Sequence, residues 1–250
     1  LQEREWFAER RPDIATAKSA ADRKRLIEDL KAAEPDLHRQ FLADARKSEG
    51  ESHIMRHSGM YPLCGRGDVN LYAVFAERMR SLIKDTGRVG CVLPSGIATD
   101  DTTKFFFQDV VEKSSLATFF DFENKLLLFS AVAPVVKFCL FVAGSGHRPF
   151  KEKPVFIFFA HRVEDLHDEK RRFTLSTEDI STLNPNTRTC PIFRSATDAE
   201  LTKVIYRRTP VLLREAREDQ PETNPWGIRF NSMFHMSNDS GLFRTREELE

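Results

Sequence analysis

The segment between residues 69 and 160 alternates helical and strand-like hydrophobic patterns, and this alternation constrains the fold more than any other feature. Val69–Asp85 carries apolar side chains at helical spacing. Arg88–Leu93 follows as a short apolar run bounded by Gly87 and Pro94, which predicts a buried strand. Thr102–Lys113 is again helical in pattern. Helices and strands in alternation favour an α/β sheet.

Three further strands are predicted in the same region, at Leu116–Phe122, Val135–Ala143 and Val155–Ala160. Thirteen of the 21 phenylalanines lie between Phe105 and Phe159, so we expect the hydrophobic core here. The helix predicted over Val69–Asp85 is expected to place one apolar stripe against that core. The stripe consists of Leu71, Val74, Phe75, Met79, Leu82 and Ile83.

The segments before and after this central part differ from it in residue composition. Asp13–Lys31 and Pro35–Lys47 are charge-balanced, Ala-rich helical patterns that indicate a surface helical hairpin. After Gly144, prolines and charge runs interrupt short apolar pieces, which places a domain boundary near Gly144–Pro154. The predicted division is a helical insertion at 1–60, a central unit at 61–146 and a third segment at 147–250.

Charge and cysteine usage exclude several protein classes. Lys and Arg total 38 and so do Asp and Glu, which rules out a polybasic tail but leaves room for a basic groove. The four cysteines form no CxxC motif, so neither a disulfide framework nor a zinc site is indicated, and reduced thiols favour a cytoplasmic protein. The longest apolar tract, from Leu126, meets Lys137 too soon to span a membrane. Because the sequence begins with Leu1 rather than Met, in the middle of a charged stretch, we expect a fragment of a longer chain.

Common catalytic and binding motifs are missing from the sequence. There is no GxGxxG loop, His53 and His57 lack an HExxH context and are expected to be solvated, and no metal site is predicted. Ser95 lies in Pro-Ser-Gly rather than GxSxG. The Arg-Gly-Asp string ending at Asp68 reads as a turn whose Asp caps the next helix. The loop 94–99 follows a predicted strand, so it is either a ligand-binding strand end or an ordinary turn.

A longer ordered pattern resembles a known family. The sequence GRGDVNLYAVFAERMRSLIKDTGRVGCVLPSGIATDD resembles the part that follows the catalytic motif in adenine-specific DNA methyltransferases of restriction–modification type. The similarity is greatest to large single-chain members with an attached target-recognition region. Further blocks resemble later parts of the same family, in the same order: Asp121–Phe129, Lys137–Leu140, Leu183–Ser195 and Asn224–Phe243.

The resemblance implies the C-terminal half of a class I S-adenosylmethionine-dependent methyltransferase sheet, preceded by a helical hairpin and followed by the start of an α+β target-recognition region. In that fold the last strand runs antiparallel to the others and forms a hairpin with its predecessor, which assigns Val135–Ala143 to the hairpin. The cofactor loop and the catalytic Asn-Pro-Pro-aromatic motif are expected upstream of Leu1. We therefore expect no catalytic residue in this chain and no activity from the chain alone.

Several residues take roles from the resemblance alone. Phe129 matches the position that stacks on the flipped adenine, although a plain core role is the alternative. Asn70, Tyr72, Phe75 and Pro94 match the neighbourhood of the S-adenosylmethionine pocket.

The third segment carries the expected contacts with double-stranded DNA. Four arginines are candidates for phosphate contacts, with a solvated surface as the alternative: Arg188, Arg194, Arg207 and Arg208. The parent chain is expected to serve restriction or phage defence, with a fused nuclease or helicase domain as a further partner. A non-catalytic DNA-binding or assembly module is the competing function.

Overall fold

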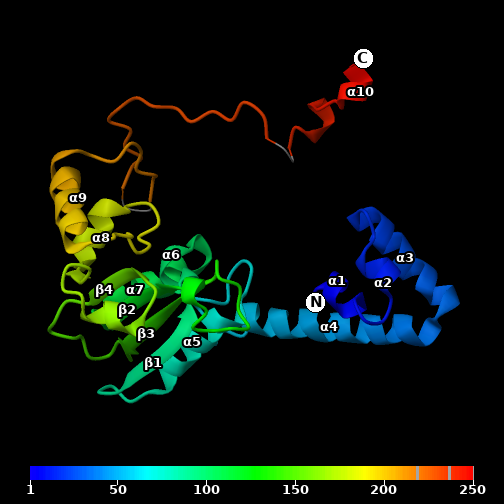
Figure 1. Ribbon diagram of the computed structural model, residues 1–250, viewed down its shortest axis with the longest axis horizontal. Helices are drawn as coiled ribbons and strands as arrows, with labels where there is room; N and C mark the ends of the chain where they lie inside the picture. The colour runs from blue at the N-terminus through cyan, green and yellow to red at the C-terminus, as the bar shows by residue number, and fades with distance from the viewer. Residues whose placement is uncertain (218–219, 236–237, 250) are drawn as a thin grey trace.

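The computed structural model describes residues 1–217, 220–235 and 238–249 (Figure 1). Residues 236 and 237 belong to the last block of the resemblance, so that part of it lies outside the described residues. A helical unit comes first and an α/β unit follows, with the long helix α4 (Pro35–His57) leading from one to the other.

The N-terminal helices surround a small core of their own. Before α4 come α1 (Glu3–Phe7), α2 (Pro12–Ala15) and α3 (Ala20–Ala33). Their shared core consists of Trp6, Phe7, Ile14, Ile27, Leu30 and Phe41. The packing of α3 on α4 agrees with the expected helical hairpin. The prediction of a single helix over Asp13–Lys31 is wrong, because the helical conformation is interrupted between α2 and α3. Ser19 caps α3 there by accepting a hydrogen bond from the Asp22 N–H.

Within the described residues, five strands form one mixed sheet in the order β1-β3-β2-β4-β5. The strands are β1 (Arg88–Pro94), β2 (Leu116–Glu123), β3 (Lys137–Gly144), β4 (Val155–Ala160) and β5 (Phe173–Thr174). β3 lies antiparallel between β1 and β2, and β4 runs parallel to β2. The prediction that Val135–Ala143 forms an antiparallel hairpin with the preceding strand, in one sheet with Arg88–Leu93, is confirmed.

Helices cover one face of this sheet and enclose the main core. They are α5 (Leu71–Leu82), α6 (Gly96–Thr99) and α7 (Lys104–Glu112), with the short helix η1 (Asp101–Thr103) before α7. The buried side of α5 matches the predicted apolar stripe only in part, since Val74 is buried and Met79 and Ile83 are half-buried. Ala73, Val74 and Ala76 are buried, whereas Leu71 and Phe75 are 56% and 61% exposed. The N-cap is also Asn70, not Asp68, since the Asn70 side chain accepts a hydrogen bond from the Tyr72 N–H.

Two buried charges explain why α5 presents this side. The Arg80 guanidinium donates to the Gly144 carbonyl at 3.0 Å and to the Ser115 hydroxyl at 3.0 Å, and pairs with Asp109 at 2.5 Å. The Glu77 carboxylate accepts hydrogen bonds from the backbone N–H groups of residues 63 and 64. Breaking such buried pairs is strongly destabilising, because an unpaired buried charge remains.

The opposite face of the sheet has a thinner cover. A small cluster of Phe122, Ile157 and Ala160 packs there with Phe138 and with Leu166 of η3 (Val163–His167). On β1, Val92 is 55% exposed. In the part of the chain that the structure describes, β1 pairs only with β3, so its other edge carries no strand partner.

The sheet continues across the expected division at residue 146, because β4 and β5 hydrogen-bond into it. Two helices follow, α8 (Thr177–Leu183) and α9 (Ala196–Arg208). The C-terminal segment then extends away from the sheet, with η4 (Ser240–Leu242) and α10 (Arg246–Leu249) near its end (Figure 1). No helix in the described residues has the length and apolar character needed to cross a membrane.

Candidate functional site

The candidate site lies where three parallel strands end. β1 and β2 both pair antiparallel with β3, and β4 is parallel to β2. The carboxyl ends of β1, β2 and β4 therefore lie together along one border of the sheet, which we term the carboxyl edge. Ligands of open α/β sheets bind outside this edge. The residues that meet there are Ser95 after β1, Asp121 near the end of β2 and Phe159 near the end of β4.

A buried carboxylate joins these three strand ends. The Ser95 hydroxyl donates a short hydrogen bond to Asp121, and the Phe159 backbone N–H donates to the other Asp121 oxygen at 3.2 Å. Burial raises the pKa of the Asp121 carboxyl above its usual range, while these two hydrogen bonds act in the opposite direction. No histidine is hydrogen-bonded to Ser95 within the described ranges, so the pair is not a Ser-His-Asp nucleophile.

The turn after β1 brings α5 to the same edge. A methyl group at Gly96 would overlap the Asp100 carboxylate, which would have to move, and would lie 3.2 Å from the Tyr72 hydroxyl oxygen. Burial, followed by the nearby Asp100 charge, raises the pKa of Tyr72 to about 12. Tyr72 therefore stays a neutral hydroxyl beside this turn.

The loop after β2 carries an exposed aromatic ring on a rigid support. It begins with η2 (Asn124–Leu126), whose Asn124 is fully buried. The Asn124 side chain accepts from the Phe129 N–H at 3.0 Å and donates to the carbonyls of Phe129 and Val132 at 2.9 and 2.8 Å. Phe129 is 45% exposed and meets Phe138 edge to face, with ring centroids 4.9 Å apart.

Two lysines and a histidine surround one carboxylate at the end of β2. Glu123 contacts the Lys125 ammonium at 2.5 Å, His161 Nε2 at 2.9 Å and the Lys137 ammonium at 3.5 Å. The hydrogen bond with Lys125, followed by that with His161, lowers the pKa of Glu123 to about 2. Glu123 is therefore an anion at any physiological pH, and it holds together side chains from η2, from β3 and from the residue that follows β4.

Sequence reasoning missed Asp121, Glu123 and Phe159 as site residues. The signal was present in β2, because two acids at alternating positions of a phenylalanine-rich strand must share one face. Nothing in the sequence indicated that β4 would pair parallel to β2 and bring Phe159 to Asp121.

The structure separates the residues matched to the cofactor neighbourhood. Asn70 uses its side-chain oxygen to cap α5, Phe75 faces outward, and Pro94 is exposed opposite Phe138 on β3. Tyr72 alone points to the turn after β1. These four residues do not enclose S-adenosylmethionine by themselves, so the chain does not supply a complete cofactor pocket from them.

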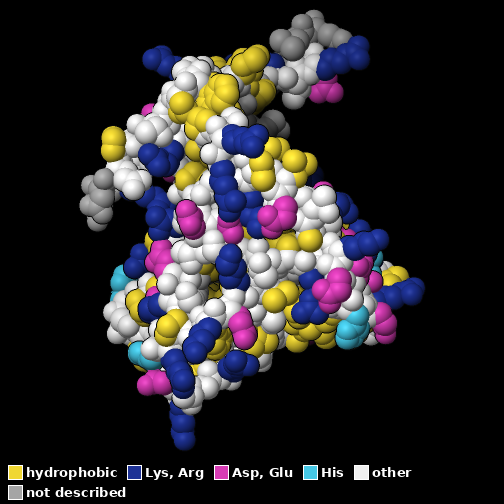
Figure 2. Space-filling view, turned by 90° about the vertical axis from the view of Figure 1, so that its left-hand side faces the viewer, with side chains coloured by type: hydrophobic (Ala, Val, Ile, Leu, Met, Phe, Trp, Pro, Cys, Tyr) yellow, Lys and Arg dark blue, Asp and Glu magenta, His cyan; other side chains and the backbone are white. Residues whose placement is uncertain are grey.

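The four candidate arginines also lie in different settings. Arg188 pairs with Glu112 at 2.7 Å and Arg207 with Asp179 at 2.8 Å. Arg208 is exposed in the last turn of α9. Arg194 lies over the Phe159 ring, with its guanidinium carbon 4.5 Å from the centroid, and so is the one that reaches the sheet edge. On the face shown in Figure 2, basic side chains are interspersed with acidic ones and form no continuous basic surface.

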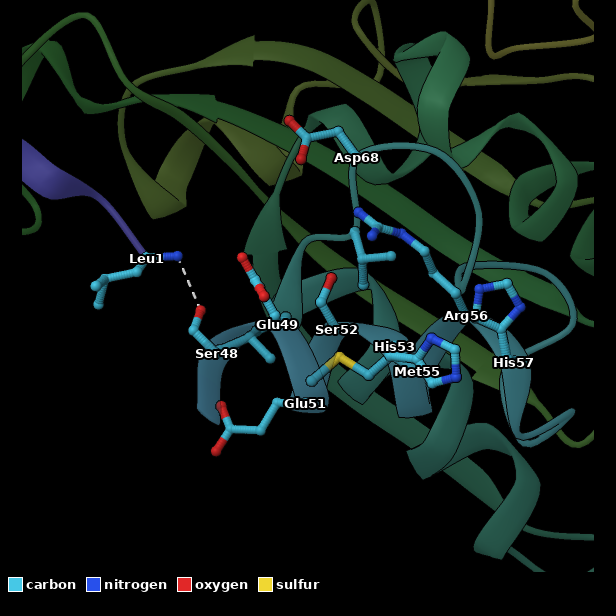
Figure 3. Close-up of a pocket in the computed structure, with 12 residues that line it drawn as sticks. Leu1, Ser48, Glu49, Glu51, Ser52, His53, Met55, Arg56, His57 and Asp68 are labelled. Atoms are coloured by element: carbon cyan, nitrogen blue, oxygen red, sulfur yellow. Dashed lines mark hydrogen bonds between the residues drawn. The ribbon is translucent and has the colours of Figure 1, made fainter. Parts of the chain in front are cut away.

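A separate cavity of about 530 Å³ lies between α4 and the turn before α5 (Figure 3). His53 and His57 lie side by side on α4, with ring centroids 4.4 Å apart. Both are exposed, as expected, and no group of three or more potential metal ligands exists among the described residues. Arg56 donates to the Gly67 carbonyl at 3.1 Å, which ties the Arg-Gly-Asp turn to α4 as a structural connection.

No protein-family model matches the chain, and no curated protein matches it significantly.

Proposed function

We propose that this chain forms part of an adenine-specific DNA methyltransferase of restriction–modification type, which methylates the exocyclic amino group of adenine with S-adenosylmethionine as methyl donor. One observation carries the proposal. An antiparallel strand, β3, lies between β1 and β2, and the loop joining β2 to β3 presents an aromatic ring at the carboxyl edge. The resemblance requires both the hairpin and the ring.

The position of Phe129 suits a base-stacking role. A ring that is 45% exposed keeps a free surface, while its edge-to-face contact with Phe138 and the hydrogen bonds between Asn124 and the Phe129 backbone hold it in position. A rigid aromatic side chain stacks on an extrahelical base at little entropic cost. In this proposal Phe129 holds the flipped adenine, and Asn124 is a positioning residue for Phe129.

The uncovered surfaces of the sheet support a larger catalytic unit. The unpaired edge of β1 and the exposed Leu71, Phe75 and Leu82 of α5 lie next to one another in the fold, since α5 packs beside β1. Exposed apolar groups in such a setting mark contact surfaces. In the proposed enzyme, further strands and the catalytic Asn-Pro-Pro-aromatic motif complete the sheet on this side.

The same surfaces favour one alternative of a different class. A non-catalytic DNA-binding or assembly module would use the exposed side of α5 to contact another protein chain. The two functions differ in one outcome, because only the enzyme leaves methylated adenine in DNA.

Expression of the complete gene tests the function without knowledge of the DNA site. The host should lack adenine methylation, and sequencing that detects N6-methyladenine directly should then reveal one DNA motif methylated at nearly every copy. The 250-residue chain expressed alone is the matched control and should methylate nothing. A stable complete protein that leaves the genome unmethylated would support the module instead.

A further inference from the structure

One strained aromatic residue at the carboxyl edge supports two cations. Phe159 has a φ of +59°, which is rare for a bulky side chain. The Lys137 ammonium lies 4.5 Å from its ring centroid, and the Arg194 guanidinium carbon lies 4.5 Å from the same centroid. Backbone strain of this kind persists only where surrounding contacts enforce it, and it is concentrated at functional sites.

A β-bulge produces this conformation. The parallel register of β2 and β4 shifts between Phe120, opposite Ile157, and Phe122, opposite Ala160. The Phe159 N–H binds Asp121, while its carbonyl accepts from Arg171 at 3.2 Å. Bulges commonly reorient a side chain next to a binding site. Here the bulge brings the Phe159 ring between residues from β3 and from the segment before α9.

Arg194 borders a cavity of about 290 Å³, which we term the basic cradle, and Lys137 lies next to it on the same Phe159 ring. Its lining includes Lys125, Arg171, Arg194 and His161, with Glu123 as the single carboxylate among the described lining residues. Lys125 pairs with Glu123, and Arg171 pairs with Asp168 at 3.4 Å. Arg194 has no carboxylate partner in the described part of the chain, so its charge is available to an anion.

The basic cradle lies across the sheet edge from the exposed ring. Neighbouring residues of a strand point to opposite faces. On β3, Lys137 therefore reaches Phe159 on one face while Phe138 supports Phe129 on the other. A DNA strand that crosses this edge would have a base at Phe129 and a backbone phosphate at the basic cradle.

We propose that the basic cradle binds one phosphodiester group of the DNA strand, beside the nucleotide whose base is held by Phe129. The inference rests on the function proposed above and assigns a phosphate contact to Arg194, with Lys137 beside it. Arginine suits this role because its planar fork matches phosphate oxygens. The contact fixes the position of the strand and is independent of base sequence.

DNA binding by the 250-residue chain tests the inference. Fluorescence anisotropy with a labelled duplex that contains one unpaired adenine gives the Kd over a series of KCl concentrations. Arg194→Ala should weaken binding about tenfold and lower the slope of log Kd against log salt by about 1, equally for unrelated sequences. Arg194→Lys keeps the charge and should keep the slope. Arg25→Ala removes the same charge from exposed α3 and should change neither quantity.

Three results would overturn the inference. The first is a chain that does not bind DNA, and the second is an Arg194→Ala variant with unchanged Kd and slope. The third is calorimetric binding of inorganic phosphate or dAMP that depends on Arg194 while DNA affinity does not, which would identify a site for a free phosphate or nucleotide.

Methylation and DNA binding, measured together, distinguish failure of this inference from failure of the proposed function. If the complete protein methylates adenine but Arg194→Ala does not affect DNA binding, only the phosphate-site proposal is refuted. If DNA binding depends on Arg194 but the complete protein does not methylate DNA, only the methyltransferase proposal is refuted.

Discussion

The Asp121 carboxylate accepts the backbone N–H of Phe159 at 3.2 Å and thereby ties the end of β2 to a bulged residue of β4 with a φ of +59°. The second carboxylate oxygen accepts the Ser95 hydroxyl from the end of β1. One buried side chain therefore sets the relative positions of three strand ends, and the geometry of the candidate site depends on it.

Replacing Asp121 with Ala should destabilise the fold strongly. The change leaves two buried donors, the Ser95 hydroxyl and the Phe159 N–H, without an acceptor. We expect a loss of about 3 kcal/mol in the free energy of unfolding, measured by urea denaturation at neutral pH. Asp121→Asn keeps an acceptor oxygen and should lose clearly less. Equal losses in the two variants would contradict the hydrogen-bonding role.

The raised pKa of Asp121 predicts a specific pH dependence. An acid whose pKa is higher in the folded protein than in the unfolded chain destabilises the fold once it ionises. The free energy of unfolding therefore falls as pH rises above the pKa of the unfolded chain, about 3.9. Asp121→Asn lacks this cost. The stability of the variant relative to the wild type should therefore improve as pH rises from below that value to neutrality, and urea titrations of both proteins across this range measure the difference. A difference that stays constant with pH would refute the shift.

Glu123 should show the opposite sign. Its pKa is lowered to about 2, so the carboxylate stabilises the folded protein above its unfolded value of about 4.3, and this contribution is lost as pH falls toward 2. Glu123→Gln should be less stable than the wild type at pH 6 and equally stable near pH 2. Thermal melts at the two pH values provide the comparison. A stability gap that persists in acid would show that packing, rather than the charge contacts with Lys125 and His161, accounts for the loss.

The sequence predicts the strands better than the orientation of the helix. Arg88–Leu93 is identifiable because a short apolar run between glycine and proline has few alternatives. In α5 two faces compete, one with large apolar side chains such as Leu71 and Phe75, the other with Ala73 and Ala76. Periodicity favours the larger side chains. The choice in the fold is made by partners distant in sequence, since Arg80 reaches the Gly144 carbonyl. The contact between Asp121 and Phe159 was unpredictable for the same reason.

Adjacent residues of α5 provide a matched test of that orientation. Val74 is 5% exposed and Phe75 is 61% exposed. In the 250-residue chain, Val74→Ala should lower the free energy of unfolding by about 2 kcal/mol, while Phe75→Ala should change it by less than about 0.5 kcal/mol. In the full-length methyltransferase proposed above, further strands cover α5, so Phe75→Ala should become costly there. A Phe75→Ala variant that remains neutral in the complete protein would leave that side of α5 solvated.

The last prediction separates base stacking from core packing at Phe129. Because the ring is 45% exposed and meets Phe138 in a T-shaped contact, Phe129→Ala should cost about 1 kcal/mol of stability rather than the ~3–5 kcal/mol typical of a buried phenylalanine. In the complete protein the same change should weaken the hold on an extrahelical adenine about 5- to 150-fold, the equivalent of ~1–3 kcal/mol of stacking, while affinity for S-adenosylmethionine stays unchanged. A fluorescent base analogue at the target position reports flipping, and a thermal melt reports stability. Asn124→Ala is the companion variant: it keeps the phenylalanine but removes the hydrogen bonds that hold its backbone, so flipping should weaken in the same direction. A Phe129→Ala protein that melts far earlier yet flips adenine normally while folded would assign Phe129 to the core.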